Sequence, residues 1–181
     1  MSRCRIIFSG SGGQGVITAS VILAEAAVIH EGLNATQSQS YGPEARGGAT
    51  RADVIIDNDE INFPKVNQPN VLVSLTQMAY DKFSWIIRPG GLLLVDGHYV
   101  KIQRKLDARQ VSLDMYDGVM KGTGEPIAYN ICVLGALIGM IGLVRPEAIM
   151  KVLKTRVPNE FLGMNQKALD IGLRLAESAL K

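Results

Sequence analysis

The stretch Gly10-Ser11-Gly12-Gly13-Gln14-Gly15 decides the fold, because it separates a strand-like segment from a helix-like one. Residues 4–9 before it form a short apolar run, and residues 16–28 after it are helix formers with apolar side chains on nearly every side. The order strand, tight loop, helix is therefore predicted, with Gly32 ending the helix. A strand that turns into a helix N-terminus leaves unpaired backbone N–H groups and the positive end of the helix dipole facing one point, which suits a phosphate or carboxylate.

The spacing of Gly10, Gly12 and Gly15 matches the fingerprint of dinucleotide-binding folds. That fingerprint also needs an acidic residue at the end of the second strand, and residues 35–38 contain none. A nicotinamide or flavin dinucleotide is therefore disfavoured. A nucleoside triphosphatase is disfavoured because the Gly-Lys-Ser/Thr ending of its phosphate loop is absent. Two interpretations stay open: the loop binds another anion, or its glycines only let the helix pack closely on the strand. Gln14 is the residue that the packing interpretation explains least.

A second glycine-rich loop follows the second predicted strand. Its candidate binding residues are Ser40, Tyr41, Gly42, Pro43, Glu44, Arg46, Gly47 and Gly48. Gly47 and Gly48 permit close backbone approach, while Glu44 and Arg46 offer an ion pair or an anion clamp. Tyr41 adds a flat apolar face. The alternative is an ordinary hairpin with surface charges, but two glycine-rich loops at the ends of neighbouring strands favour a shared binding site.

The predicted fold class is α/β, with residues 1–181 forming a single domain: a three-layer Rossmann-like mixed sheet with flanking helices and a C-terminal helical region. The chain leaves no room for a crossover helix between the predicted strands at residues 33–37 and 50–57, so these strands should be antiparallel. Met78, Phe83 and Trp85 are expected to be buried. Further strands are predicted at residues 71–75, 92–96 and 111–115, a short edge piece at residues 61–64, and helices at residues 77–85, 127–144, 145–155 and 158–181.

The predicted helix at residues 127–144 is apolar enough to resemble a membrane span. Asn130 and the lack of flanking cation clusters favour a helix buried in protein instead. Gly135 and Gly139 have the spacing by which helices pack closely, and we expect one face of this helix to contact a partner subunit. In the last helix, the expected buried stripe is Phe161, Leu162, Ala168, Leu169, Leu173, Ala176 and Leu180.

The composition indicates an ordinary globular protein. With 47% hydrophobic residues, 20% charged residues and a net charge of +2, neither disorder nor a polyanionic partner is indicated, and nucleic acid is disfavoured. No apolar leader precedes the first strand, so a cytoplasmic protein is expected. The local cations at positions 101–109 are interpreted as a solvated face: Lys101, Arg104, Lys105 and Arg109.

Cys4 and Cys132 have no Cys or His neighbour at metal-ligand spacing, so each is interpreted as a small core residue. A chain without a cysteine cluster does not by itself hold an iron–sulfur centre, and no metal site is expected. His30 and His98 lie outside both glycine loops and are interpreted as structural.

These motifs resemble the gamma subunit, or gamma domain, of the 2-oxoacid:ferredoxin oxidoreductases. The matching segments are residues 10–16, 23–27 and 40–49, with weaker agreement at residues 79–83 and 165–172. The form Ser-Tyr-Gly-Pro-Glu-x-Arg-Gly-Gly is similar to the 2-oxoglutarate-specific members, whereas pyruvate-type subunits tend toward Phe-Gly-Pro-Glu-Arg-Arg-Gly-Ala.

The resemblance implies a complex that converts a 2-oxoacid, favoured to be 2-oxoglutarate, and CoA to an acyl-CoA (succinyl-CoA), CO2 and reduced ferredoxin. It implies that this chain has no catalytic residues of its own and helps to position CoA at residues 12–15 and 46–48. Thiamine diphosphate, Mg2+ and [4Fe-4S] clusters would belong to partner subunits: alpha, beta and a ferredoxin-like delta. The alternatives are a subunit-contact module without a coenzyme role, or the related subunit of a pyruvate or indolepyruvate oxidoreductase.

Overall fold

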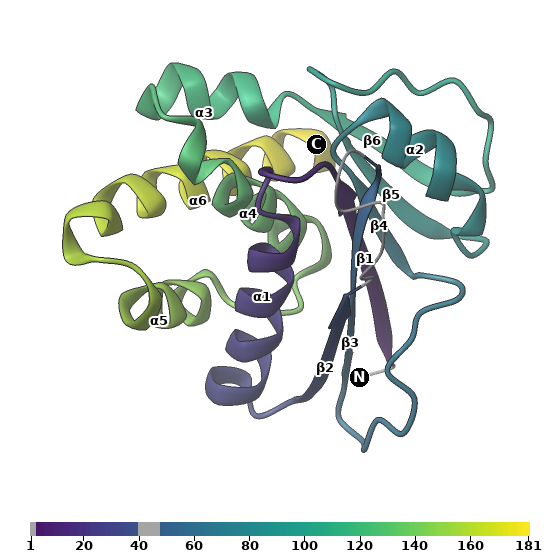
Figure 1. The fold of residues 1–181 in the computed structure, drawn as a ribbon, viewed down its shortest axis with the longest axis horizontal. Coiled ribbons are helices and arrows are strands. Elements are labelled where there is room, and N and C mark those ends of the chain that lie inside the picture. The colour runs from purple at the N-terminus through teal and green to yellow at the C-terminus, as the bar shows by residue number, and fades with distance from the viewer. Residues whose placement is uncertain (1–2, 40–47) are drawn as a thin grey trace.

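The structure is a computed structural model that describes residues 3–39 and 48–181. The strands are β1 (Cys4–Gly10), β2 (Asn34–Gln39), β3 (Thr50–Asp57), β4 (Val71–Ser74), β5 (Gly91–Asp96) and β6 (Ala108–Leu113). The helices are α1 (Val16–Glu31), α2 (Gln77–Phe83), α3 (Met115–Thr123), α4 (Tyr129–Ile141), α5 (Pro146–Arg156) and α6 (Asn159–Leu180), with short 3-10 turns η2 (Ser84–Ile86) and η3 (Pro126–Ala128). The first two thirds of the chain contain all the strands of the sheet, with α1 and α2 between them, and helices make up the rest (Figure 1).

The six strands form one mixed sheet in the order β2-β3-β1-β4-β5-β6. Strands β1, β4, β5 and β6 are parallel, whereas β3 runs antiparallel to both β1 and β2. The mixed sheet and the antiparallel pair around the second loop are therefore confirmed. The carboxyl ends of the parallel strands meet at one edge, which is where open α/β sheets usually bind ligands.

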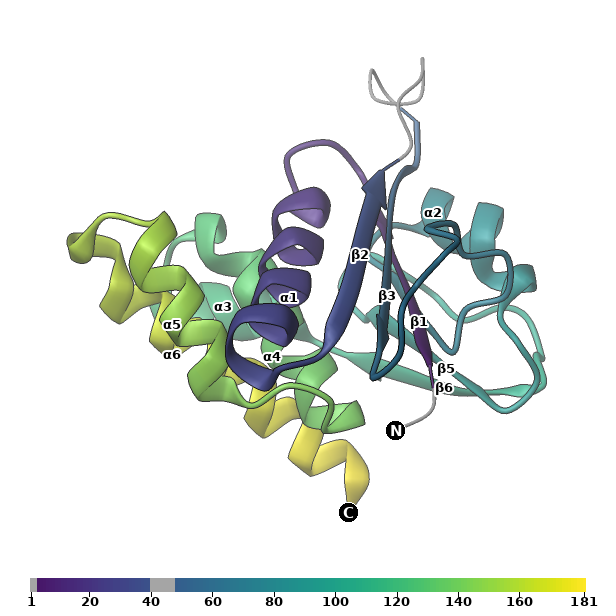
Figure 2. The ribbon, with the colours of Figure 1, turned by 90° about the horizontal axis from the view of Figure 1, so that it is seen from below.

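The sheet is covered on both faces, which confirms the three layers (Figure 2). Alternate side chains of β1 point to opposite faces, as the period of two requires. Ile6 and Phe8 belong to the core beneath α1 and α4, and Ile7 belongs to the smaller core beneath α2.

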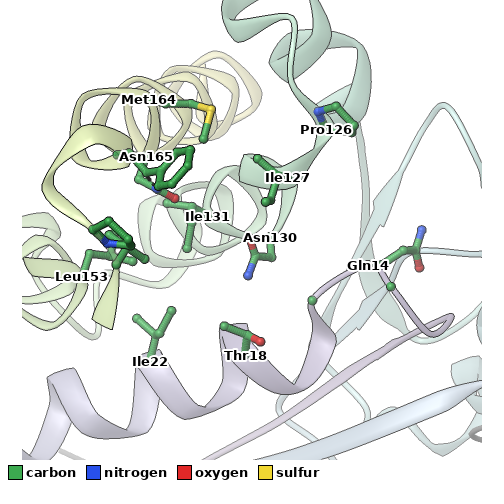
Figure 3. Close-up of a pocket in the computed structure, with 15 residues that line it drawn as sticks. Gln14, Thr18, Ile22, Pro126, Ile127, Asn130, Ile131, Leu153, Met164 and Asn165 are labelled. Atoms are coloured by element: carbon green, nitrogen blue, oxygen red, sulfur yellow. Dashed lines mark hydrogen bonds between the residues drawn. The ribbon is translucent and has the colours of Figure 1, made fainter. Parts of the chain in front are cut away.

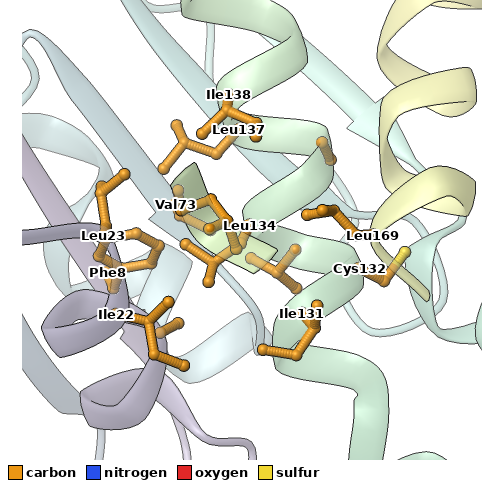
Figure 4. Packing of buried hydrophobic residues seen from close by; sticks show 14 of the residues in the cluster. Phe8, Ile22, Leu23, Val73, Ile131, Cys132, Leu134, Leu137, Ile138 and Leu169 are labelled. Atoms are coloured by element: carbon orange, nitrogen blue, oxygen red, sulfur yellow. The ribbon is translucent and has the colours of Figure 1, made fainter. Parts of the chain in front are cut away.

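Helix α4 is buried within its own chain, between the sheet and α6 (Figure 4). A Cβ on Gly135 would collide with the backbone carbonyl of Leu169, and one on Gly139 would lie 2.7 Å from Cβ of Ala176. The predicted close packing at these glycines is confirmed, and Gly172 of α6 makes the matching approach to Cys132 O. The expectation that one face of α4 contacts a partner subunit is wrong, because α6 occupies that place. No helix in the described part of the chain is long and apolar enough to cross a membrane.

Three expectations for the loops and edges are wrong. Residues 61–64 form no strand, since they lie in a loop in which the Pro64 carbonyl accepts a hydrogen bond from Ser38 Oγ. Met78 and Trp85 are 56% and 69% exposed, because the short α2 buries Ala79, Tyr80 and Phe83 instead. The two ends of the α6 stripe, Phe161 and Leu180, are also exposed.

Helix α3 is not predicted from the sequence, because its two glycines and its polar residues make the short amphipathic pattern hard to recognise. The predicted strand at residues 111–115 ends at Leu113, and Met115 begins α3. Gly118 and Gly122 stand where a Cβ would run into Ile171 of α6, so both glycines permit helix packing.

Candidate functional site

The glycine loop between β1 and α1 is held in place by the side chain of Gln14. Gln14 Oε1 accepts a hydrogen bond from Ser11 N at 2.8 Å, and Nε2 donates to Leu75 O, just after β4, at 3.1 Å. A Cβ on Gly10 would lie 2.5 Å from Gln14 Oε1, so the first glycine makes room for this bridge. Gln14 therefore positions the loop. This role agrees with the packing interpretation, which the sequence alone could not extend to Gln14.

The same loop leaves backbone donors without partners. Among the described residues, no acceptor meets the N–H groups of Gly12, Gly13 and Gly15. Gly13 and Gly15 have φ of 88° and 71°, a backbone conformation that residues other than glycine rarely adopt. No described side chain caps the first turn of α1, and that turn contains no acidic residue. The loop thus retains the free donors and the uncompensated positive dipole end that suit an anion.

A cavity of about 430 Å³ opens beside this loop (Figure 3). Gly13 and Gly15 line one side, and Asn130 at the start of α4 faces them. Its amide nitrogen is 2.7 Å from the position that a Cβ on Gly15 would take, so glycine is needed there for close contact. The remaining walls are mainly apolar and come from α1, η3, α4, α5 and α6, including Ile22, Ile127, Ile131, Leu153, Phe161 and Met164.

The cavity and the loop suit different parts of a ligand. The free N–H groups suit a phosphate or carboxylate, and the apolar walls suit an uncharged group. Two asparagines line the cavity: Asn165 donates to Phe161 O at 2.8 Å, and the side chain of Asn130 makes no hydrogen bond with a described residue. These wall residues were not predicted as site residues. Asn130, a polar residue in an apolar stretch, was the available signal.

The structure describes the strands on either side of the second glycine loop. Gln39 ends β2 and Thr50 begins β3, the strand next to β1, so the loop leaves and re-enters the sheet at the end that carries the first loop. Gly48 is a half-buried bend residue. The other predicted residues of this loop lie outside the described residues: Ser40, Tyr41, Gly42, Pro43, Glu44, Arg46 and Gly47.

A buried carboxyl at the end of β5 was not predicted. Asp96 accepts hydrogen bonds from the Tyr129 hydroxyl at 2.6 Å and from the backbone N–H groups of His98 and Tyr116, each at 2.9 Å. Burial raises the pKa of Asp96, and the Tyr129 hydroxyl opposes this rise. His98 Nδ1 lies 2.9 Å from Asp117 Oδ1 on α3. These contacts tie α3 and α4 to the sheet edge, so we assign them to the framework of the site.

The cysteines behave as core residues. Cys132 is buried and Cys4 is partly buried. Burial raises the pKa of the Cys4 thiol to about 11 and that of Cys132 to about 12, so both are protonated at neutral pH and are poor metal ligands. Within residues 3–39 and 48–181, no three His, Cys, Asp or Glu side chains are grouped for a metal ion.

Comparison with known proteins identifies the family. The family described as pyruvate ferredoxin/flavodoxin oxidoreductase matches residues 5–175. The chain belongs to this family. It is 39% identical over 177 residues to the 2-oxoglutarate synthase subunit KorC of Methanocaldococcus jannaschii, which covers 97% of this chain and 95% of that protein. The resemblance predicted from the two glycine loops is therefore confirmed.

Solved structures of this oxidoreductase family share the fold. The gamma subunit of a keto/oxoacid ferredoxin oxidoreductase from Geobacter sulfurreducens is 41% identical, with a TM-score of 0.87 over 97% of this chain and 99% of that chain. A 2-oxoglutarate:ferredoxin oxidoreductase from Magnetococcus marinus, solved with 2-oxoglutarate, coenzyme A and succinyl-CoA bound, has a TM-score of 0.87 and 20% identity. It matches 98% of this chain and 32% of that chain, so the same fold is one part of a longer polypeptide there.

Proposed function

We propose that residues 1–181 form the gamma subunit of a cytoplasmic 2-oxoglutarate:ferredoxin oxidoreductase. The supporting observation is the likeness to a 2-oxoglutarate synthase subunit over nearly the full length of both proteins. The complex would convert 2-oxoglutarate and CoA to succinyl-CoA and CO2 and would pass electrons to ferredoxin. This chain contributes binding and placement rather than a catalytic group.

In this proposal, the role of this chain in the complex is to hold CoA. CoA carries a diphosphate and a 3′-phosphate, and Gly12, Gly13 and Gly15 offer unpaired N–H groups at the open end of α1. Arg46, Gly47 and Gly48 would approach from the second loop, whose flanking strands end at the same sheet edge. A thiol acceptor of the acyl group that is held in place reacts faster than one that must be captured from solution, and this placement is the proposed contribution to catalysis.

Thiamine diphosphate, Mg2+ and [4Fe-4S] clusters are assigned to partner subunits, which we propose to be alpha, beta and a ferredoxin-like delta. The residues of this chain do not fit a cluster, because its two thiols lie on β1 and α4 and are protonated. The chain alone is therefore expected to be inactive.

Copurification tests this function. The tagged chain, isolated from its native host, should bring down thiamine- and cluster-containing subunits and should reduce ferredoxin with 2-oxoglutarate and CoA. Pyruvate should support a rate at least tenfold lower. Isolation as a monomer without such partners would contradict the assignment, and preferential use of pyruvate or indolepyruvate would assign the chain to a related complex.

A further inference from the structure

A second hollow lies at the opposite edge of the sheet from the glycine loop. Its volume is about 610 Å³, and its walls come from the start of β1, from the loop between β3 and β4, and from the turn before β5. Three cations line it together with two amides and an aromatic ring: Arg5, Lys65, Arg88, Asn67, Gln68 and Phe63. No acidic side chain is among the described residues that line it.

The three cations of this hollow are not paired with any carboxylate of the described residues. Within the described part of the chain, the side chains of Arg5, Lys65 and Arg88 form no ion pair or hydrogen bond. Other arginines of the protein do hold carboxylates, namely Arg3 with Asp57, Arg51 with Asp53, Arg145 with Glu31 and Arg156 with Glu25. Like charges that converge without a counter-ion repel one another, so an anion in the hollow would be stabilised by all three.

Backbone contacts fix the positions from which two of these cations project. Arg5 N donates to Asn70 Oδ1 at 2.9 Å, and Asn70 N donates to Arg5 O at 2.8 Å. Arg88 N donates to Pro69 O at 3.1 Å. Arg5 and Arg88 are thus tied to adjacent residues of one segment.

The backbone that carries the third cation, Lys65, is fixed by contacts with β3. Lys65 precedes Val66, which is buried and whose N–H donates to Asp53 Oδ2 at 2.9 Å. The Arg51 side chain donates to the carbonyl of Val66. A hollow walled by cations on such fixed backbone needs little rearrangement to bind.

We propose that this hollow binds a phosphate-bearing small molecule, with the phosphates between Arg5, Lys65 and Arg88. Arginine presents a planar fork that matches phosphate oxygens, and lysine adds a point charge. Phe63 is 60% exposed and lines the same hollow, so it offers an aromatic face to the ring of a nucleotide. Free inorganic phosphates and nucleotides share this chemistry.

The site is separate from the proposed CoA site. Arg5 lies near the beginning of β1, whereas the glycine loop follows its end at Gly10, roughly 17 Å away at about 3.3 Å per residue. The inference therefore does not rest on the proposed function.

Calorimetry on the full chain at low ionic strength tests it, with inorganic pyrophosphate and ADP as probes. The variant Arg5→Gln/Lys65→Gln/Arg88→Gln should bind both probes at least tenfold more weakly. The control Lys101→Gln/Lys105→Gln/Lys121→Gln removes the same charge from exposed positions and should bind as the native chain does. Circular dichroism would establish that each variant is folded.

The variant Phe63→Ala distinguishes nucleotides from inorganic phosphates as the ligand of the hollow. A threefold or larger loss for ADP alone assigns the hollow to nucleotides, and unchanged affinity for both probes assigns it to inorganic phosphates. Equal binding by the triple variant and the native chain, or no binding by the native chain at millimolar probe, would overturn the proposal. Loss of ADP binding in Gly13→Asp but not in the triple variant would also overturn it, and would place the nucleotide at the glycine loop.

Discussion

Gly10, the last residue of β1, is the register partner of Thr50, the first residue of β3. The loop that follows Gly10 and the loop that precedes Thr50 therefore leave the sheet at the same point. The residues from which the two glycine-rich loops depart, Gly10 and Thr50, are therefore neighbours at the end of the sheet where the parallel strands finish. This pairing is the structural basis for treating the two loops as one site.

The close contact between α4 and α6 predicts a large effect from a single methyl group. In Gly172→Ala, the new Cβ would collide with Cys132 O of α4, so the helices must separate, at a cost of about 1–3 kcal/mol. Gly163→Ala is the matched control, because it lies in the same helix with open space around it and should gain up to about 1 kcal/mol. Urea unfolding measures both, and equal effects would contradict the packing described.

The Tyr129 hydroxyl is predicted to stabilise ionised Asp96. Because burial raises the pKa of Asp96 above its ordinary value of 3.8, its contribution to the free energy of unfolding falls as pH rises through the folded-state pKa. Tyr129→Phe removes one hydrogen bond to the carboxylate and raises this pKa further. The variant should lose about 1.5–3 kcal/mol at neutral pH and less in acid.

Tyr116→Phe is the control for this variant, because Tyr116 bonds Asp96 through its backbone N–H, which the substitution keeps. Unfolding free energies measured between pH 4.5 and pH 8 make the comparison. A loss in Tyr129→Phe that does not change with pH would argue against an ionised Asp96 in the folded chain.

Trp85, the single tryptophan, offers a simple optical check of the α2 region. It is 69% exposed, and its indole N–H donates to Lys82 O. The free chain should show the red-shifted emission of an exposed indole, and acrylamide should quench it nearly as well as it quenches free tryptophan. Blue-shifted, protected emission from the free chain would mean that α2 packs differently.

Much of the fold could be predicted because its elements carry strong local signals. Strand β3 alternates, α1 lies between two glycines, and Pro146 begins α5, so their bounds were close to the observed ones. The errors occur where tertiary contacts override local pattern. Met78 and Trp85 were expected inside because they are apolar, but a two-turn helix buries one narrow side.

The site was predicted only in part, since its walls come from segments far apart in the chain. The glycine loop has a local signature, whereas Asn130 lines the cavity because the start of α4 lies next to the start of α1 (Figure 3). The function of Gln14 depends on Leu75, just after β4, which no spacing rule connects to it.

Calorimetry of CoA against the purified complex tests the central claim most directly, with Gly13→Asp compared with Gly13→Asn. Gly13 has a φ of 88° and open space around it, so both side chains meet the same backbone strain and only aspartate adds a negative charge. If the loop amides hold a CoA phosphate, Gly13→Asp should bind CoA at least tenfold more weakly than Gly13→Asn, and Arg46→Ala should also weaken binding. Equal CoA affinity in both Gly13 variants, with the complex intact, would contradict a coenzyme role for the glycine loop.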